Sequence, residues 1–189
     1  MADDPGSPIL TALYHRRFDE AERLADGVPL TIWEAAALGR EARVRELLQN
    51  DPGLANAWAP DGFMPVGLAA FFGHASTARL LLEAGADAHA VARNDMKVQP
   101  LHAAVAARSL EIVELLFARA VDPNARQQVG YTPLMAAAGA GNDELVSVLL
   151  AHGADPSLVA EDGKTAAMLA QDHGHAAVAE RLSAVVARR

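Results

Sequence analysis

The sequence contains no cysteine, so disulfides and thiolate chemistry are excluded. Aromatic residues are also scarce, at 5% of the chain, although hydrophobic residues make up 51% of it. No apolar run reaches about 18 residues, the length from which a membrane-spanning helix is expected. These features predict small, closely packed helices rather than a bulky globular core, and no segment that crosses a membrane.

Positive charge is in the minority. The chain carries 16 Lys and Arg against 24 Asp and Glu, which gives a formal net charge of −8. This charge disfavours nucleic acid and anionic membranes as partners, because both are themselves negative. The first residues, MADDPGSP, are acidic and lack the basic segment of a signal peptide, so a cytoplasmic location is expected. The Ala- and Arg-rich composition points to a bacterial source.

Motifs for catalysis and cofactor binding are missing too. The sequence has no HExxH, GxSxG, GxxxxGKS/T or GxGxxG pattern, and no Cys/His metal spacing. Its seven histidines are not spaced as metal ligands, since His173 and His175 lie two apart across a turn rather than four apart on a helix. We therefore expect no catalytic residues, no metal and no cofactor.

A helical hairpin is predicted at residues 130–154. Thr132 can cap a first helix, and Pro133 suits its first position, where no backbone donor is needed. Gly141 can take the left-handed turn that ends this helix. The apolar residues of the second helix recur at helical spacing: Leu145, Val146, Leu149 and Leu150. Two helices this short cannot bury such a face alone, so they require copies of themselves on each side.

The copies recur with a period near 33 residues. Turns equivalent to that of Pro133 carry Pro65, Pro100 and Ala166, at spacings of 35, 33 and 33. The glycines between the two helices of each hairpin fall in the same frame: Gly39, Gly73, Gly141 and Gly174. Arg108 stands where a fifth glycine should be. A left-handed conformation would cost a non-glycine residue on the order of 1 kcal/mol, so we expect this turn to differ.

This pattern resembles the ankyrin repeat family. The matching segments are TPL-type helix starts, a Gly-His turn, leucine pairs and Gly-Ala-Asp turns: Thr132-Pro133-Leu134, Gln99-Pro100-Leu101-His102, Gly73-His74, Leu81-Leu82, Leu115-Leu116, Leu149-Leu150, Gly85-Ala86-Asp87 and Gly153-Ala154-Asp155. The resemblance implies an all-α fold, an α-solenoid of stacked helix-turn-helix units with β-hairpin fingers. It also implies structural roles for three histidines: His102 bonds the backbone of the neighbouring repeat, while His74 and His175 support the turns between helices.

We predict one domain over residues 1–189. It consists of a degenerate N-terminal helix pair, four repeats and a C-terminal capping repeat: 1–29, 30–56, 57–88, 89–123, 124–155 and 156–189. The predicted core includes two leucine pairs of the second helices: Leu81, Leu82, Leu149 and Leu150.

Large side chains break the repeat pattern at positions that the family uses to bind partner proteins. In that family, partners contact the tips of the fingers and the concave side of the first helices. By register, the predicted partner-binding residues are Trp58, Phe63, Phe71, Phe72, Arg93, Met96, Lys97, Arg126, Gln128 and Tyr131. Aromatic and Arg side chains are typical interface anchors. The finger before Pro100 is two residues longer than its equivalent before Pro133, and Gly67 leaves room for a neighbouring aromatic side chain.

Alternatives remain for both the residues and the protein. Phe71 or Phe72 could pack against the neighbouring Ala-rich helix, with Trp58 and Phe63 folded over the finger. We favour a monomeric scaffold that binds another protein, but a self-associating structural or assembly module fits the same sequence. An accessory subunit of a stress-response enzyme also fits, because some bacterial ankyrin proteins that this chain resembles work beside oxidative-stress enzymes.

Overall fold

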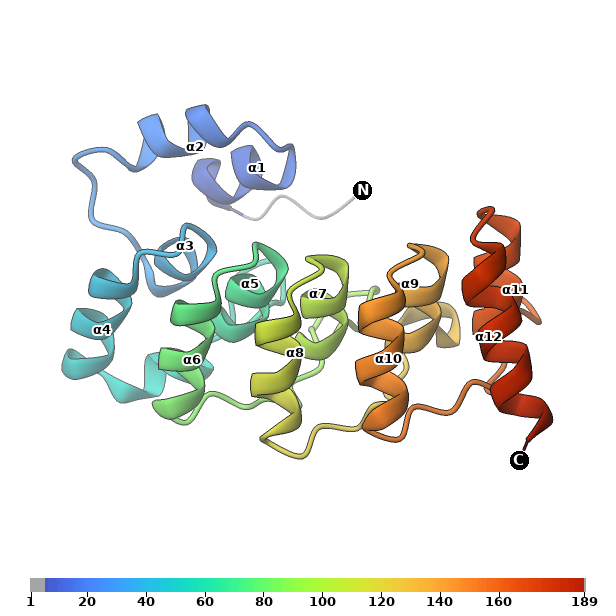
Figure 1. Ribbon diagram of the computed structural model, residues 1–189. Coiled ribbons are helices and arrows are strands. Elements are labelled where there is room, and N and C mark those ends of the chain that lie inside the picture. The colour runs from blue at the N-terminus through green and yellow to red at the C-terminus, as the bar shows by residue number, and fades with distance from the viewer. Residues whose placement is uncertain (1–5, 189) are drawn as a thin grey trace.

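The computed structural model describes residues 6–188, in which ten helices form five pairs that stand side by side (Figure 1). The first, or inner, helices of the pairs are α3 (Ile32–Ala37), α5 (Pro65–Phe71), α7 (Pro100–Ala106), α9 (Pro133–Gly139) and α11 (Ala166–Asp172). The second, or outer, helices are α4 (Glu41–Asn50), α6 (Ala75–Glu83), α8 (Leu110–Phe117), α10 (Asp143–Ala151) and α12 (Ala176–Ala187). Within each pair the two helices pack together, and each inner helix packs on the next inner helix. The stack is an α-solenoid.

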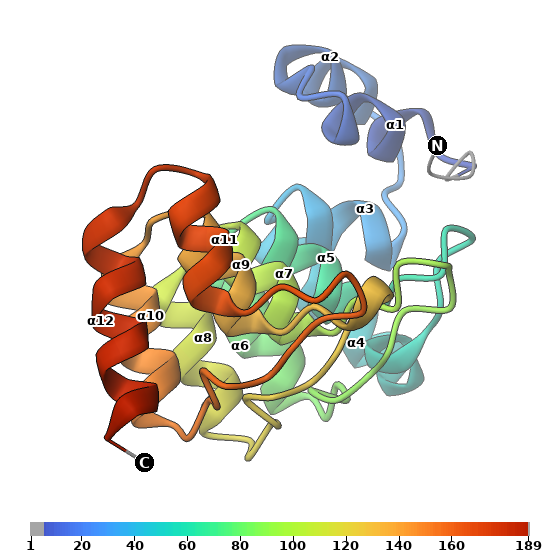
Figure 2. The same cartoon turned by 90° about the vertical axis from the view of Figure 1, so that its right-hand side faces the viewer.

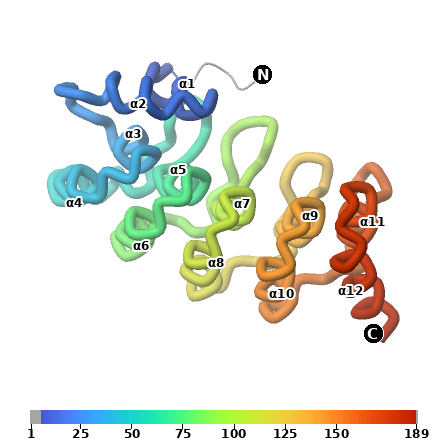
Figure 3. Tube along the Cα trace, turned by 45° about the horizontal axis from the view of Figure 1, so that its top comes forward, coloured from blue at the N-terminus to red at the C-terminus, as the bar shows by residue number. Residues whose placement is uncertain are grey.

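A sixth pair, α1 (Pro8–Tyr14) and α2 (Phe18–Ala25), precedes the stack. α1 packs against α3, whereas α2 lies apart from the row of outer helices and across their direction (Figures 1 and 3). The sequence predicts a degenerate pair here, but not this placement. In α2 the only buried residue is Ala21, and its one leucine, Leu24, is exposed, so the helix does not enter the core as the other outer helices do.

Capping residues explain where α9 and α11 begin. Thr132 Oγ1 accepts a hydrogen bond from the N–H of Met135 (3.3 Å), and Pro133 occupies the first helical position. Thr165 caps α11 through the N–H of Met168 (3.3 Å). The cap is therefore sufficient in the last repeat, where the family's proline is absent.

Leucines from the outer helices and alanines from the inner helices form the core. Leu81, Leu82 and Leu149 are each at most 1% exposed, as predicted. Leu150 is only half-buried and packs at the edge of the core. On the inner helices, fully buried alanines such as Ala69 let the neighbouring helices approach closely.

Four loops that lead into inner helices project from the stack as fingers, comprising residues 59–63, 92–98, 127–131 and 160–164 (Figures 2 and 3). One backbone hydrogen bond closes each finger, for example from the N–H of Ala92 to the carbonyl of Val98 (2.8 Å). The β-hairpin form of the fingers is not confirmed. Residues 6–188 contain no strand, because one closing bond per finger does not amount to a ladder.

The expectation that the turn at Arg108 differs from the others is wrong. Arg108 has φ 57°, so it keeps the left-handed conformation of the glycine turns. The N–H of Arg108 bonds Val105 O (3.0 Å), as the N–H of Gly141 bonds Ala138 O (3.0 Å). Packing of the helices on either side therefore outweighs the local cost of the left-handed residue.

Candidate functional site

Two neighbouring fingers bring four of the predicted residues close together. Met96, Gln128 and Tyr131 line a shallow groove together with Gln127 and Val129. Met96 is 47% exposed and Val129 is 43% exposed, so both present apolar surface to solvent. The fingers are joined here by a hydrogen bond from the N–H of Gln128 to Met96 O (2.9 Å). Lys97, next to Met96, is exposed as well.

Val129 is a feature of this groove that the sequence analysis missed. It has φ 63° and ψ 14°, and Gly130 follows with φ 74°. Two consecutive positive φ values are typical of a type I′ turn, which favours Asn-Gly. A β-branched residue in this conformation is an outlier. Nothing in the segment Gln127-Gln128-Val129 indicates this backbone strain from the sequence alone.

The longer finger forms its turn without glycine. Lys97 takes the positive φ (50°) instead. The side chain of Asn94 supports the turn, since its Oδ1 accepts a bond from the N–H of Met96 (3.1 Å) and its Nδ2 donates to Asp61 O (2.9 Å). The N–H of Arg93 also donates to Gly62 O (2.8 Å). The finger is thus fixed to the one before it.

Trp58, Phe63 and Arg93 lie at the base of the first two fingers. The Arg93 guanidinium carbon lies 4.1 Å from the centroid of the Trp58 ring, a cation–π contact. Trp58 and Phe63 are half-buried and line a small cavity with Gly67. Phe63 Cδ1 would lie 3.9 Å from a Cβ at Gly67, so an aromatic ring does approach this glycine, at an ordinary contact distance. These two aromatics contribute to packing as well as to surface.

Phe71 and Phe72 form an aromatic cluster with a residue that the site prediction did not include. Tyr14 of α1 lies with its ring centroid 6.1 Å from that of Phe71 and 5.7 Å from that of Phe72, and the two phenylalanine rings are 5.1 Å apart. Phe71 remains exposed and Phe72 is half-buried. Both rings therefore contact the N-terminal helix pair. The sequence analysis could not predict this contact, because Tyr14 lies more than one repeat before Phe71 and Phe72.

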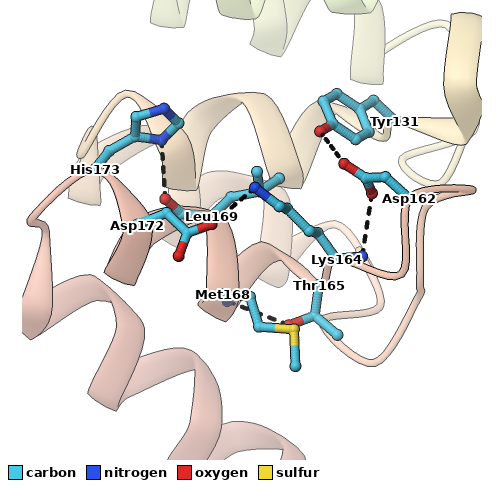
Figure 4. Close-up of polar contacts among 8 residues, drawn as sticks. All are labelled: Tyr131, Asp162, Lys164, Thr165, Met168, Leu169, Asp172 and His173. Carbon is cyan, nitrogen blue, oxygen red and sulfur yellow. Dashed lines mark hydrogen bonds and ion pairs between the residues drawn. The ribbon is translucent and has the colours of Figure 1, made fainter.

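Tyr131 and Arg126 connect the third finger to the last one, and Figure 4 shows the contact of Tyr131. The Tyr131 hydroxyl donates to Asp162 Oδ2 (2.7 Å), and this bond raises the pKa of Tyr131. Lys164, two residues after Asp162 in the last finger, pairs with Asp172 Oδ2 of α11 (2.8 Å). Arg126 is exposed, and its Nη1 donates to Val159 O (3.0 Å).

The predicted residues thus separate into two groups. One lies between the fingers 92–98 and 127–131, and the other lies around the finger 59–63 and the end of α5. The polar groups in both serve to connect loops. In the part of the chain that the structure describes, no three His, Cys, Asp or Glu side chains come together as a metal site.

The histidines have the structural positions that the resemblance implies. His102 Nε2 donates to Ala125 O of the next repeat (3.1 Å), and its Nδ1 faces the N–H of Gln99 (3.4 Å). Burial lowers the pKa of His102 to about 4. His74 Nε2 donates to Ala37 O (3.0 Å), and the His175 ring lies against the turn at Gly141.

The repeats place this chain in a known family. A family model described as ankyrin repeats (3 copies) matches residues 32–127 and 120–185. The chain belongs to the ankyrin repeat family, whose members generally serve as modules for protein–protein interaction. No curated protein matches the chain. None of the helices within residues 6–188 has both the length and the apolar character needed to cross a bilayer.

Proposed function

We propose that this protein binds a partner protein on the concave surface formed by the inner helices and the fingers, and that it catalyses no reaction. The observation that carries the proposal is the groove between the fingers 92–98 and 127–131. There Met96 and Val129 expose apolar side chains beside Tyr131. Exposed apolar side chains gathered next to an aromatic ring are typical of interaction surfaces.

The rigidity of the fingers supports this proposal. Each finger in this region is bonded to both of its neighbours, from Arg93 to Gly62, from Gln128 to Met96 and from Glu161 to Val129 (2.8, 2.9 and 3.0 Å). Side chains on such a frame lose little conformational entropy when a partner binds, so more of the contact energy appears as affinity. The strained Val129 fits the same idea, because backbone strain tends to collect at functional positions.

The distribution of charge suits an interface with an uncharged centre and a charged rim. The inner helices α5, α7 and α9 contain no Asp, Glu, Lys or Arg, so the middle of the concave surface is uncharged. Of the predicted charged contacts, Arg93 and Lys97 lie on a finger and Arg126 directly precedes one. Because the whole chain carries a formal charge of −8, a partner with a basic patch would associate faster. Charges at the rim affect the association rate more than the affinity.

The proposal includes a monomer in the bacterial cytoplasm. The absence of cysteine is consistent with a reducing compartment, since nothing in the fold depends on oxidation. Light scattering after size exclusion at increasing concentrations tests the monomer. A mass that rises with concentration would favour the self-associating module instead.

Affinity capture from lysate of the native host tests the binding surface. The interface variant carries Met96→Ser and Val129→Asn, two exposed positions whose replacement leaves the core intact. The control carries Val28→Ser and Val186→Ser, which are exposed apolar positions away from this groove. Trp58 and Phe72 are less suitable, because both are half-buried and a loss of binding would be confused with a loss of packing.

We expect wild type and the control to capture the same protein and the interface variant to lose it. Circular dichroism and a thermal melt confirm that all three are folded. Equal capture by the interface variant would remove the two fingers from the binding surface and contradict the proposal.

A further inference from the structure

α1 lies in the angle between a finger and two inner helices, at the N-terminal end of the concave surface. The hydroxyl of Tyr14, its last residue, donates to Asp61 Oδ2 in the first finger (2.8 Å). The Tyr14 ring covers Phe71 and Phe72 at the end of α5. In front of α1, Ser7 Oγ donates to Glu34 Oε1 of α3 (2.7 Å). The chain's own helix, which packs on α3, therefore occupies part of the surface assigned above to a partner.

The site that receives Tyr14 provides both a hydrogen-bond acceptor for its hydroxyl and apolar contacts for its ring. Asp61 is buried although it is an acid, and its second oxygen accepts the N–H of Phe63 (3.1 Å). Burial raises the pKa of Tyr14, and the negative charge of Asp61 raises it further, so the hydroxyl stays protonated and donates. Two phenylalanine rings supply the apolar wall. Such a site selects a ring with a hydroxyl over a plain apolar side chain, because Asp61 would otherwise lose a partner.

Outside α1, the helix pair is held weakly. α2 buries only Ala21, while Phe18, its first residue, is 51% exposed. The ion pair between Arg40 and Glu22 is half-exposed on both sides, and exposed pairs add little stability. In the connection to α3, residues 26–29 are exposed and Gly27 has φ 69°, while Leu30 is buried. α1, by contrast, buries Ile9, Leu10 and Leu13, so an occupant that displaces the pair must bury an equivalent apolar face.

A hydrogen bond links the covered site to the finger that borders the open groove. Asn94 Nδ2, in the longer finger, donates to Asp61 O (2.9 Å), and Met96, two residues on, is part of the groove. A ligand lying in the groove and extending toward α5 would meet α1 at Asp61. Occupation by α1 and by such a ligand is therefore mutually exclusive at this end of the surface.

We propose that α1–α2 is a displaceable occupant of the N-terminal end of the concave surface, and that the partner displaces it with an amphipathic helix that presents a tyrosine to Asp61, Phe71 and Phe72. α1 itself defines this chemistry, with Ile9, Leu10, Leu13 and Tyr14 at i, i+1, i+4 and i+5. The inference rests on the proposed function for the existence of a partner. The test of the site needs no partner.

The test uses a synthetic peptide of residues 6–29 as the probe, labelled with a fluorophore at its C-terminus, and the full-length chain as the receptor. In wild type, the attached helix pair competes at high effective concentration. In the Tyr14→Ala chain it holds the site less firmly. We expect fluorescence anisotropy to report at least tenfold tighter peptide binding to Tyr14→Ala than to wild type. A Phe18→Ala chain, altered at an exposed residue of the same pair, should behave as wild type.

A peptide that itself carries Tyr14→Ala should bind the Tyr14→Ala chain at least tenfold more weakly than the native peptide. Equal binding of the two peptides, or no binding of either, would overturn the proposed site. Amide hydrogen exchange of residues 9–14 provides a second readout, which should quicken in the Tyr14→Ala chain. Unchanged exchange would mean that Tyr14 does not hold the pair in place, and the proposal would be wrong. Failure here leaves the capture experiment unaffected, so the two proposals can fail separately.

Discussion

Histidine rings cover the turn glycines in two of the hairpins. A Cβ added to Gly39 would lie 2.5 Å from His74 Nδ1, and one added to Gly141 would lie 2.4 Å from His175 Nδ1. These glycines are therefore required both for their left-handed backbone and for their lack of a side chain. By register, Asn142 stands over the turn at Arg108 as His74 stands over Gly39 and His175 over Gly141. This difference is consistent with a side chain being tolerated at that turn.

Replacing Gly141 by alanine should destabilise the protein more than replacing Gly73. Both residues have positive φ (64° and 79°), so each alanine costs about 1–2 kcal/mol of backbone strain. At Gly73 nothing lies within 4 Å of the added Cβ, whereas at Gly141 the ring of His175 must move. Overpacking of this kind adds about 1–3 kcal/mol. Urea unfolding of both variants measures the difference, and equal losses would contradict the role of His175.

Val129→Asn should stabilise the chain by about 1 kcal/mol, because asparagine tolerates the left-handed conformation that valine resists. Val159→Asn is the matched control. Val159 is also an exposed valine beside a finger, but its φ is not positive, so its replacement should change stability by less than about 0.5 kcal/mol. Chemical denaturation checks both. A destabilised Val129→Asn chain would mean that the valine side chain packs usefully in the free protein.

His102 should make the protein less stable in mild acid. Its pKa is about 4 when folded, against 6.5 for an unperturbed histidine. Between these values the unfolded chain binds more protons, so the free energy of unfolding falls as the pH falls from 6.5 toward 4, by up to roughly 3 kcal/mol. His102→Gln should show a smaller loss between pH 7 and pH 4.5 in urea titrations. Identical losses would show that other groups cause the acid sensitivity.

At the scale of elements, the helices of the stack were predictable and the N-terminal pair's position was not. The leucine spacing, the Thr caps and the prolines specify each inner and outer helix locally, and the 33-residue period then places neighbours. Tyr14 offers no such local signal, because its partners Asp61 and Phe72 lie more than one repeat away. The proposed binding surface shares this difficulty, because Met96 and Val129 come together only through the spacing of adjacent fingers.

Leu149→Ala should cost roughly 2–5 kcal/mol, because Leu149 is fully buried on α10 and its removal leaves a cavity between repeats. Lys164→Ala should cost less than about 1 kcal/mol, since the ion pair with Asp172 is exposed on both sides. Thermal melts compare the two. Similar shifts in melting temperature would indicate that α10 does not join the core as described.

At the scale of the whole molecule, the two long sides of the stack differ in character. The outer helices carry surface ion pairs, such as Arg79 with Glu111 and Arg181 with Asp143. The inner helices α5, α7 and α9 carry no charged residue, and they adjoin fingers with exposed apolar tips. We propose that the uncharged side recognises the partner, and α1–α2 covers one end of this recognition side.

Amide hydrogen exchange of the protein, free and bound to the captured partner, tests the recognition side most directly. We predict slower exchange in the fingers at residues 92–98 and 127–131, faster exchange in α1, and no change in the outer helices α4, α6, α8 and α10. Protection confined to the outer helices, with the fingers unchanged, would contradict the account.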